Sequence, residues 1–284
     1  MGAKKITIID KIKSLSSKLP PKQAELAEYI LLHYKTAAFM TSTALGAASG
    51  SSESTVVRFA VSLGYSGFPE FQASLQELIQ NELSTLDRFS VGAIQDESAL
   101  YQKVFATEVE IMNRVLKELS FKSFGSAVDL LFEKERLVIV GFQGSSCLAE
   151  YAGYSLNKIR PKVNILNTWD EKTFNTLSEL DGNSAAWIFA FPRYPMRTIT
   201  VSKMLKESNI PIIGFTDSVM SPLASFTDIL FTIPLKYTSY IDPFAAVMCM
   251  INSTVLGVAY KDAERTRTHL QRFEKYIEES SIFK

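Results

Sequence analysis

The chain has 284 residues, 46% of them hydrophobic, and its 30 basic side chains are balanced by 30 acidic ones. This hydrophobic content suffices for a folded core and excludes a disordered chain. Because the charge is balanced, any DNA-binding surface must be local rather than spread over the whole molecule. The two cysteines, Cys147 and Cys249, have no paired spacing, so they indicate neither a disulfide framework nor a metal site.

The N-terminus lacks the apolar core of a signal peptide. The most apolar predicted helix, residues 244–258, is interrupted by polar residues and is too short to span a bilayer. We therefore expect a cytoplasmic protein with no membrane partner.

Residues 1–80 have the periodicity of an all-helical domain. Apolar residues recur every three or four positions over 6–15 and from residue 22 onwards. A short helix over 43–48 ends at Gly50, and Ser52 can cap a second helix that stops at Gly64. A further helix is expected over 69–83. The segment carries eight Lys or Arg and six Asp or Glu, a weak excess of positive charge.

A short helix, a tight glycine turn and a capped second helix predict a helix-turn-helix motif. The second helix is expected to bury four apolar side chains: Val56, Phe59, Ala60 and Leu63. Its exposed face is expected to present the candidate DNA-binding residues Ser52, Ser54, Thr55 and Arg58. An ordinary helical bundle with a glycine-capped turn is the alternative.

Residues 84–98 are polar and poorly periodic, which indicates a linker, and helices are expected over 99–119 and 124–133. Short apolar runs then alternate with helical segments, at 137–140, 163–166, 186–191, 210–215 and 229–233. Continuous apolar runs of this kind predict a parallel sheet covered on both faces. Helices over about 243–260 and 262–279 complete the chain. The predicted domains are 1–80, a linker and connecting helix over 81–122, and 123–284.

The loops 141–146, 192–198 and 216–221 would all lie at the carboxyl edge of that sheet, where ligands bind. In the first loop a glycine turn leads straight into a helix, whose first N–H groups are unpaired. Gly144, Ser145 and Ser146 therefore make a candidate site for an anion or a polyhydroxylated ligand. One alternative is a polar turn that caps a core helix. Another is a dinucleotide site with Asp170 as the ribose-binding acid, although the third glycine of that motif is absent.

Residues 1–77 resemble the N-terminal domain of the RpiR family of bacterial regulators. The matching residues are Ser52-Glu53-Ser54-Thr55-Val56-Val57-Arg58-Phe59, Leu63-Gly64-Tyr65-Ser66-Gly67-Phe68 and Glu70-Phe71. The resemblance implies binding of a palindromic operator. Basic residues that commonly follow the Phe are replaced here by Ala60-Val61-Ser62, which predicts fewer phosphate contacts.

Residues 125–260 resemble the SIS, or sugar isomerase, domain that accompanies this N-terminal domain. The matching stretches are Gly141-Phe142-Gln143-Gly144-Ser145-Ser146, Thr216-Asp217-Ser218, Ser221-Pro222-Leu223-Ala224 and Asp228. The resemblance implies a five-stranded parallel sheet between helices. It also implies a phosphorylated sugar held by serines and backbone N–H groups.

The second SIS loop departs from the family pattern Ser-x-Ser-Gly-x-Thr. This chain has Phe191-Pro192-Arg193-Tyr194-Pro195-Met196-Arg197-Thr198 instead. Arg193 and Arg197 can supply bidentate donors, and Tyr194 can stack or hydrogen-bond, so these residues and Thr198 join the candidate effector site. The alternative is that both arginines are solvated surface charges.

The segment 239–243 precedes the long C-terminal helix. In SIS-type regulators this region can border the ligand of a neighbouring subunit. Capping of the helix by Asp242, with Pro243 at its first position, explains the residues equally well.

Catalytic residues are not apparent. His33 and His269 have the setting of ordinary helical residues, nothing in the sequence pairs with Glu150, and Cys147 is expected to pack rather than react. We expect no metal and no cofactor. The leading hypothesis is a homodimeric or tetrameric transcriptional regulator that binds double-stranded operator DNA and senses a sugar phosphate or sugar acid. The rivals are a sugar-phosphate isomerase or lyase, and a sensor that has lost DNA binding and acts through a partner.

Overall fold

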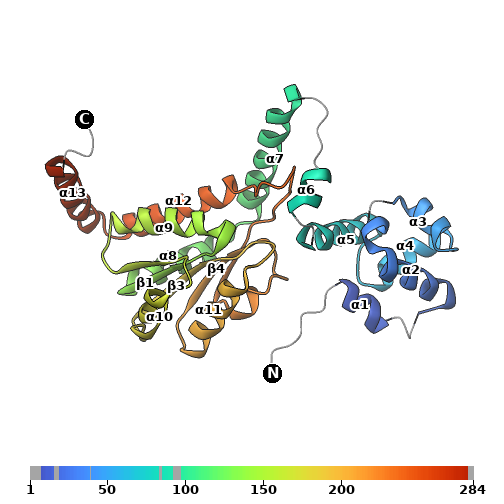
Figure 1. Ribbon diagram of the computed structural model, residues 1–284, viewed down its shortest axis with the longest axis horizontal. Coiled ribbons are helices and arrows are strands. Elements are labelled where there is room, and N and C mark those ends of the chain that lie inside the picture. The colour runs from blue at the N-terminus through green and yellow to red at the C-terminus, as the bar shows by residue number, and fades with distance from the viewer. Residues whose placement is uncertain (1–7, 16–18, 39, 83–84, 92–96, 281–284) are drawn as a thin grey trace. The chain divides into compact units, whose positions relative to one another are not determined.

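The computed structural model describes residues 8–15, 19–38, 40–82, 85–91 and 97–280. The chain divides into two compact units, Met1–Arg88 and Phe89–Lys284 (Figure 1). Each unit has its own hydrophobic core. None of the described helices is long and apolar enough to cross a bilayer.

The first unit is all-helical, as the sequence predicts. Its helices are α1 (Ile8–Leu15), α2 (Pro21–Ala37), α3 (Ser42–Ala48), α4 (Glu53–Ser62) and α5 (Phe68–Glu82), followed by α6 (Thr85–Val91). Phe59 and Phe71 are fully buried and pack edge to face, with ring centroids 5.7 Å apart. This contact joins α4 to α5, so the core of the unit fixes the position of the predicted recognition helix.

The second unit contains a five-stranded parallel sheet, which confirms the predicted fold class. The strands are β1 (Arg136–Val140), β2 (Val163–Leu166), β3 (Ser184–Phe189), β4 (Ile212–Thr216) and β5 (Ile229–Thr232), in the order β2-β1-β3-β4-β5. All six residues of β3 and the final four positions of β1 are buried. Burial on both faces explains why these strands appear in the sequence as unbroken apolar runs.

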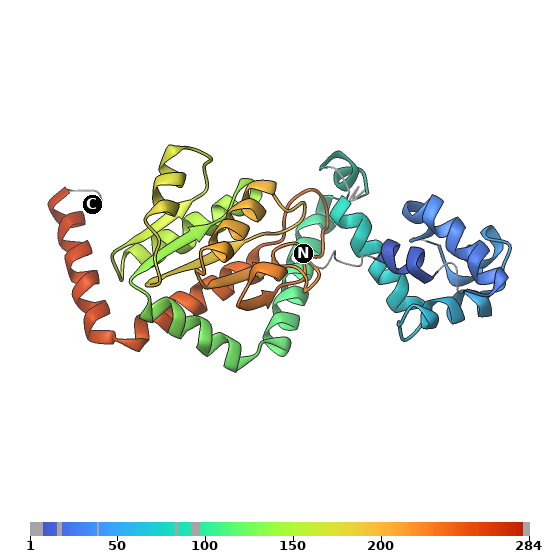
Figure 2. The ribbon, with the colours of Figure 1, turned by 90° about the horizontal axis from the view of Figure 1, so that it is seen from below.

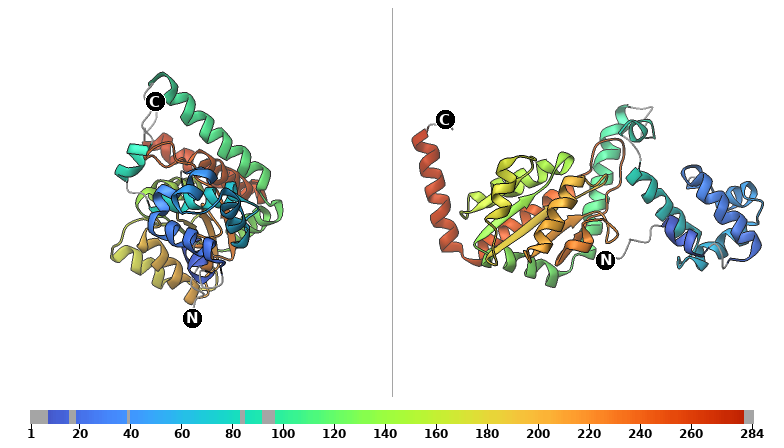
Figure 3. Two further views of the ribbon diagram at one scale, coloured as in Figure 1. Left: turned by 90° about the vertical axis from the view of Figure 1, so that its right-hand side faces the viewer. Right: turned by 60° about the horizontal axis from the view of Figure 1, so that its bottom comes forward.

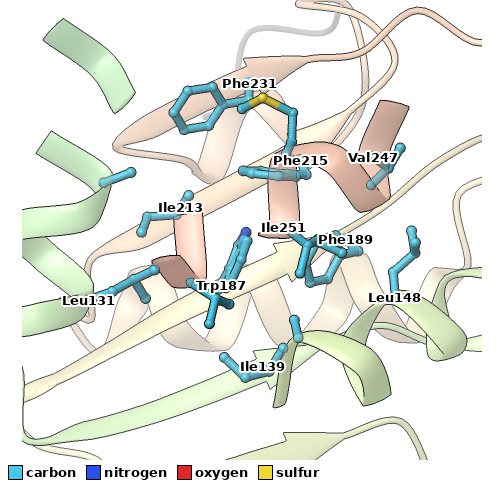
Figure 4. Close-up of a cluster of buried hydrophobic side chains, with 14 of the residues drawn as sticks. Leu131, Ile139, Leu148, Trp187, Phe189, Ile213, Phe215, Phe231, Val247 and Ile251 are labelled. Atoms are coloured by element: carbon cyan, nitrogen blue, oxygen red, sulfur yellow. The ribbon is translucent and has the colours of Figure 1, made fainter. Parts of the chain in front are cut away.

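Helices cover both faces of the sheet (Figure 2). One face packs against α8 (Phe121–Glu133), α9 (Ser146–Asn157) and α12 (Ala245–Lys261); the other packs against α10 (Glu171–Ser178) and α11 (Met196–Glu207). On the first face the rings of Trp187, Phe189 and Phe231 each lie 5.1–5.4 Å from that of Phe215 (Figure 4). This aromatic cluster holds β3, β4 and β5 together beneath α12.

The helix α7 (Glu97–Glu118) belongs to the second unit. It packs against α12, and its Ile111 and Val115 are buried in the core of that unit. The sequence predicts a linker and a connecting helix over 81–122, and α7 is a helix within this segment that contributes to the core of the second unit. The last helix, α13 (Ala263–Ser280), follows α12 and extends away from the sheet (Figure 3).

Candidate functional site

The strand order reverses between β1 and β3. These two strands are neighbours, with Val140 opposite Ile188 near their carboxyl ends. The helix after β1 packs on one face of the sheet and the helix after β3 packs on the other. The two loops therefore diverge at this edge, which is where ligands bind in open parallel sheets.

The loop after β1 makes a close turn into α9. A Cβ atom on Gly141 would lie 2.4 Å from the Ser145 carbonyl oxygen, so only glycine fits. Gln143 adopts a left-handed conformation with φ of 53°. A short 3₁₀ turn (Gln143–Ser145) then leads into α9, whose N-cap residue Ser145 makes no side-chain capping bond. Gly144 is exposed, Ser146 is half-buried and Ser145 is 3% exposed.

A carboxylate lies against this loop. A Cβ atom on Gly144 would be 3.0 Å from Oδ2 of Asp242. Asp242 belongs to the segment between β5 and α12, residues 233–244, which we call the strap. The capping alternative for Asp242 is wrong, because α12 begins at Ala245 and Pro243 lies outside it.

A glutamate from α7 occupies the N-terminus of α12 instead. The Ala245 N–H donates to Oε2 of Glu108 over 3.3 Å. Partial burial raises the pKa of Glu108, and the Ala245 hydrogen bond partly offsets this effect. Nearby, Lys236 of the strap donates to Glu110 of α7 over 2.6 Å. The strap thus lies against the β1 loop at Asp242 and is joined to α7 at Lys236, and the first residue of α12 makes a second contact with α7.

The loop after β3 is held in place by a hydrogen bond to the loop after β4. The Tyr194 hydroxyl donates to Oδ1 of Asp217, in the loop after β4, over 2.7 Å. Asp217 is only 8% exposed and also accepts a hydrogen bond from Thr216. Tyr194 has a φ of 34°, so each of the two candidate effector loops contains a non-glycine residue with positive φ. Arg193 is exposed at the surface of this loop.

Trp169 connects the two loops. The Arg197 guanidinium lies 5.8 Å from the centre of its ring, and the centre of the Phe142 ring, in the loop after β1, lies 6.1 Å from it. Arg197 is exposed, but it stacks on an aromatic face instead of being wholly solvated. Sequence analysis missed Trp169, although a tryptophan directly after the second predicted strand falls at the same edge of the sheet.

Two hydroxyl groups at this edge are buried without partners. Thr198 is 0% exposed and Ser221 is 2% exposed, and neither Oγ atom has a hydrogen-bond partner among the described residues. Thr198 is predicted to belong to the effector site, and the structure places its buried hydroxyl in the first turn of α11, at this edge of the sheet. Buried hydroxyls without partners are costly, so both are groups that a ligand or water would satisfy.

Several alternative assignments lose support. The Thr168 hydroxyl and the Thr173 N–H both bond to Asp170 and lower its pKa, so this residue caps α10 and is not a free ribose-binding acid. Burial raises the pKa of the Cys147 thiol, and the Asp242 carboxylate raises it further, which is the opposite of a reactive thiolate. Glu150 accepts a hydrogen bond from Asn167. In the part of the chain that the structure describes, no metal-ligating cluster is found.

The helix-turn-helix motif of the first unit is formed by α3, the turn 49–52 and α4. A Cβ atom on Gly46 would lie 3.0 Å from the Ser51 carbonyl oxygen, so this glycine permits the turn to pack on α3. Ser52 accepts a hydrogen bond from the Thr55 N–H and caps α4, as predicted. Val56, Phe59, Ala60 and Leu63 are buried, which also confirms the predicted inner face.

The outer face of α4 differs from the prediction at Thr55. Thr55 is 8% exposed, and its hydroxyl lies 2.9 Å from that of Ser52, so it supports the cap and does not face outward. Ser54 and Arg58 are exposed as expected. Val57 and Val61 share their face and are 39% and 53% exposed. Sequence analysis overlooked these two valines, although the spacing 54, 57, 58, 61 marks one face of a helix.

Comparison with known proteins agrees with this division. Residues 6–82 match the model of the helix-turn-helix domain of the rpiR family, and residues 130–259 match that of the SIS domain. The chain is 22% identical over 283 residues to the HTH-type transcriptional regulator HexR of Escherichia coli, covering 98% of this chain and 97% of HexR.

Two solved structures show the same fold. One is the sugar isomerase domain of an RpiR transcription factor from Sphaerobacter thermophilus, with a TM-score of 0.60 at 20% identity over 62% of this chain and 99% of that one. The other is the NanR protein of Vibrio vulnificus complexed with ManNAc-6P, with a TM-score of 0.57 at 17% identity over 95% of this chain and 97% of that one. The two resemblances predicted from the sequence are thereby confirmed.

The close turn at Gly141 leads to a test of the loop. In Gly141→Ala the new methyl group would meet backbone at Ser145, so the turn and α9 must shift, at a cost of about 1–3 kcal/mol. Urea unfolding followed by circular dichroism measures this loss. Gly125→Ala is the control, because nothing lies within 4 Å of its Cβ position in α8 and alanine stabilises a helix by up to about 1 kcal/mol. Equal stability of the two variants would contradict the assigned loop geometry.

Proposed function

Because the chain belongs to the rpiR family of helix-turn-helix transcriptional regulators, we propose that it binds operator DNA through α4 and that a sugar phosphate at the carboxyl edge of the SIS sheet controls this binding. The observation that carries the proposal is the uncapped N-terminus of α9, directly after the Gly141 turn and at the reversal of strand order. We propose a sensing role and not a catalytic one, because the candidate base Glu150 is already engaged by Asn167.

The exposed face of α4 supports binding to DNA bases through a helix that carries few charged side chains. Arg58 can donate to a guanine edge in the major groove, and Ser54 can contact a base or a phosphate. The exposed methyl groups of Val57 and Val61 suit contact with the methyl group of thymine. Because the helix carries one cation, it neutralises few DNA phosphates. Its affinity for DNA should therefore depend only modestly on the salt concentration.

The edge of the sheet supports recognition of an anion joined to a polyhydroxylated body. The N-termini of α9 and α11 both lie at this edge, and neither has a side-chain cap. Each such terminus presents free N–H groups and partial positive charge. We assign the phosphate to Gly144, Ser145 and Ser146, with Arg193 as a further donor. The sugar body would then face Tyr194, Arg197 and the hydroxyl of Thr198. NanR, which has the same fold, was solved with a sugar phosphate.

Asp242 gives this site a means of control. Its carboxylate lies against Gly144 and acts on the thiol of Cys147 in the first turn of α9. An incoming phosphate would therefore meet a like charge at close range. We propose that the phosphate displaces Asp242 and with it the strap, which is joined to α7 through Lys236 and leads into α12 at Ala245, a second contact with α7.

Substitutions in the β1 loop and in the strap are expected to change the affinity for a sugar phosphate in opposite directions. Ser145→Ala should weaken binding of a sugar phosphate about tenfold or more, because it removes a hydrogen bond to a charged group. Asp242→Asn should tighten the same binding by about twofold to tenfold, because it removes a repulsive charge. Isothermal titration calorimetry of the full chain, with hexose 6-phosphates and inorganic phosphate, measures both.

The matched control is Ser178→Ala, a serine at the far end of α10 whose hydroxyl bonds only within its own helix turn. It should leave the affinity unchanged. If Asp242→Asn binds no more tightly than the unaltered chain, the competition between Asp242 and phosphate is refuted. If Ser145→Ala and Ser178→Ala behave alike, the phosphate position is wrong.

For DNA, Arg58→Ala should weaken binding by about tenfold to a hundredfold, as expected for loss of one base contact. Fluorescence anisotropy with a labelled duplex from the region upstream of its own gene gives the affinity. Lys22→Ala is the control, because Lys22 is an exposed cation on α2 that pairs with Glu25. Equal weakening by both variants would show that Arg58 acts only as one more positive charge, and equal retention would show that α4 does not read this DNA.

A further inference from the structure

Arg197 is a cation at the carboxyl edge of the sheet that has no acidic partner. It stands in the first turn of α11, and its guanidinium makes no ion pair and no hydrogen bond with any residue that the structure describes. It lies instead over the ring of Trp169, 5.8 Å from the ring centre. A guanidinium holds five N–H donors in a fixed fork that matches a carboxylate. Because Arg197 is exposed, a ligand can reach these donors.

The surroundings of Arg197 add positive charge and supply no acid that compensates it. The helix α11 has no side-chain cap and no acidic residue in its first turn. The N-terminus of a helix carries partial positive charge, so a cation placed there is unfavourable unless an anion joins it. Asp170, the residue after Trp169, is not that anion. Its two oxygens accept hydrogen bonds from Thr168 and Thr173 instead.

Trp169 places Arg197 beside the proposed phosphate position. Two rings pack against Trp169 in edge-to-face geometry: Phe142 of the β1 loop at 6.1 Å and Phe174 of α10 at 5.0 Å. These contacts fix the indole ring, which remains half-buried. Its N–H has no hydrogen-bond partner among the described residues, so it is a further donor for a ligand. Because Arg197 and Phe142 contact the same ring, one small molecule can reach both the β1 loop and the guanidinium.

From these observations we propose that Arg197, stacked on Trp169, is a carboxylate subsite, and that the effector is a phosphorylated sugar acid. This inference rests on the proposed function and narrows the class of its ligand. The phosphate lies at the N-terminus of α9, and the carboxylate, at the other end of the same carbon chain, accepts from Arg197. A neutral sugar phosphate has only a hydroxyl group at that point, which leaves the charge of Arg197 uncompensated.

Two compounds that differ at one group test this selectivity. Gluconate 6-phosphate has a carboxylate where glucitol 6-phosphate has a hydroxymethyl group, and the rest of the carbon chain is the same. Isothermal titration calorimetry of the full chain should give a dissociation constant about tenfold or more lower for the acid. In Arg197→Gln the two compounds should bind about equally. Ser145→Ala should weaken both by a similar factor, because it acts on the phosphate that they share.

A second measurement examines the subsite without any phosphate. The chain has two tryptophans, and Trp187 is fully buried, so Trp169 is the one that a ligand at this edge can contact. Gluconate should change the tryptophan fluorescence saturably, whereas glucitol and an equal ionic strength of sodium chloride should not. The response should be lost in Trp169→Phe and in Arg197→Gln and retained in Ser145→Ala.

Lys203→Gln is the matched control, because it removes a cation from the exposed surface of the same helix. It should change neither result. Equal affinity of the unaltered chain for the two phosphates would overturn the carboxylate subsite and leave the proposed function standing. A preference for the acid that Arg197→Gln and Lys203→Gln both keep would also overturn it. If neither phosphate binds, the proposed function fails, and the response to gluconate alone decides whether the subsite exists.

Discussion

The site depends on one topological constraint: β1 and β3 are neighbours in a parallel sheet whose strand order reverses between them. Because consecutive crossovers share one hand, the connections after these two strands must leave on opposite faces. The reversal brings the N-termini of α9 and α11 to a single edge of the sheet. The unbroken burial of β1 and β3 fixes their register, so the geometry of this edge is set by the core and not by the loops themselves.

The strap between β5 and α12 extends this edge into the rest of the second unit. Near its C-terminal end Asp242 lies against the β1 loop, and near its N-terminal end Lys236 bonds to Glu110 of α7. Ala245, the residue after the strap, bonds to Glu108 of α7. The carboxylate of Glu108 accepts the Ala245 N–H bond, and its partial burial raises its pKa. If the proposed phosphate displaces the strap, these contacts are where the movement would reach α7.

The sequence predicted the sheet well because the strand signals are local: short runs of Val, Ile and Phe bounded by turn residues. It also placed the loops at the correct edge, since that follows from a parallel sheet alone. Thr55 was misjudged because a hydroxyl in the first turn of a helix can either face outward or return to the cap, and only the packing of α4 decides between them. Trp169 and the setting of Asp242 could not be predicted, because each depends on contacts between segments far apart in the chain.

The central claim is that an anion at the edge of the sheet changes how the helical domain holds DNA. Coupling of this kind is reciprocal, so the factor by which a ligand changes DNA affinity equals the factor by which DNA changes ligand affinity. The direct measurement is the dissociation constant for the operator duplex, with and without a saturating sugar phosphate that calorimetry has shown to bind. The account predicts a change of about fivefold or more, in either direction, that is lost in Ser145→Ala. A sugar phosphate that binds tightly and leaves the DNA affinity unchanged would contradict it.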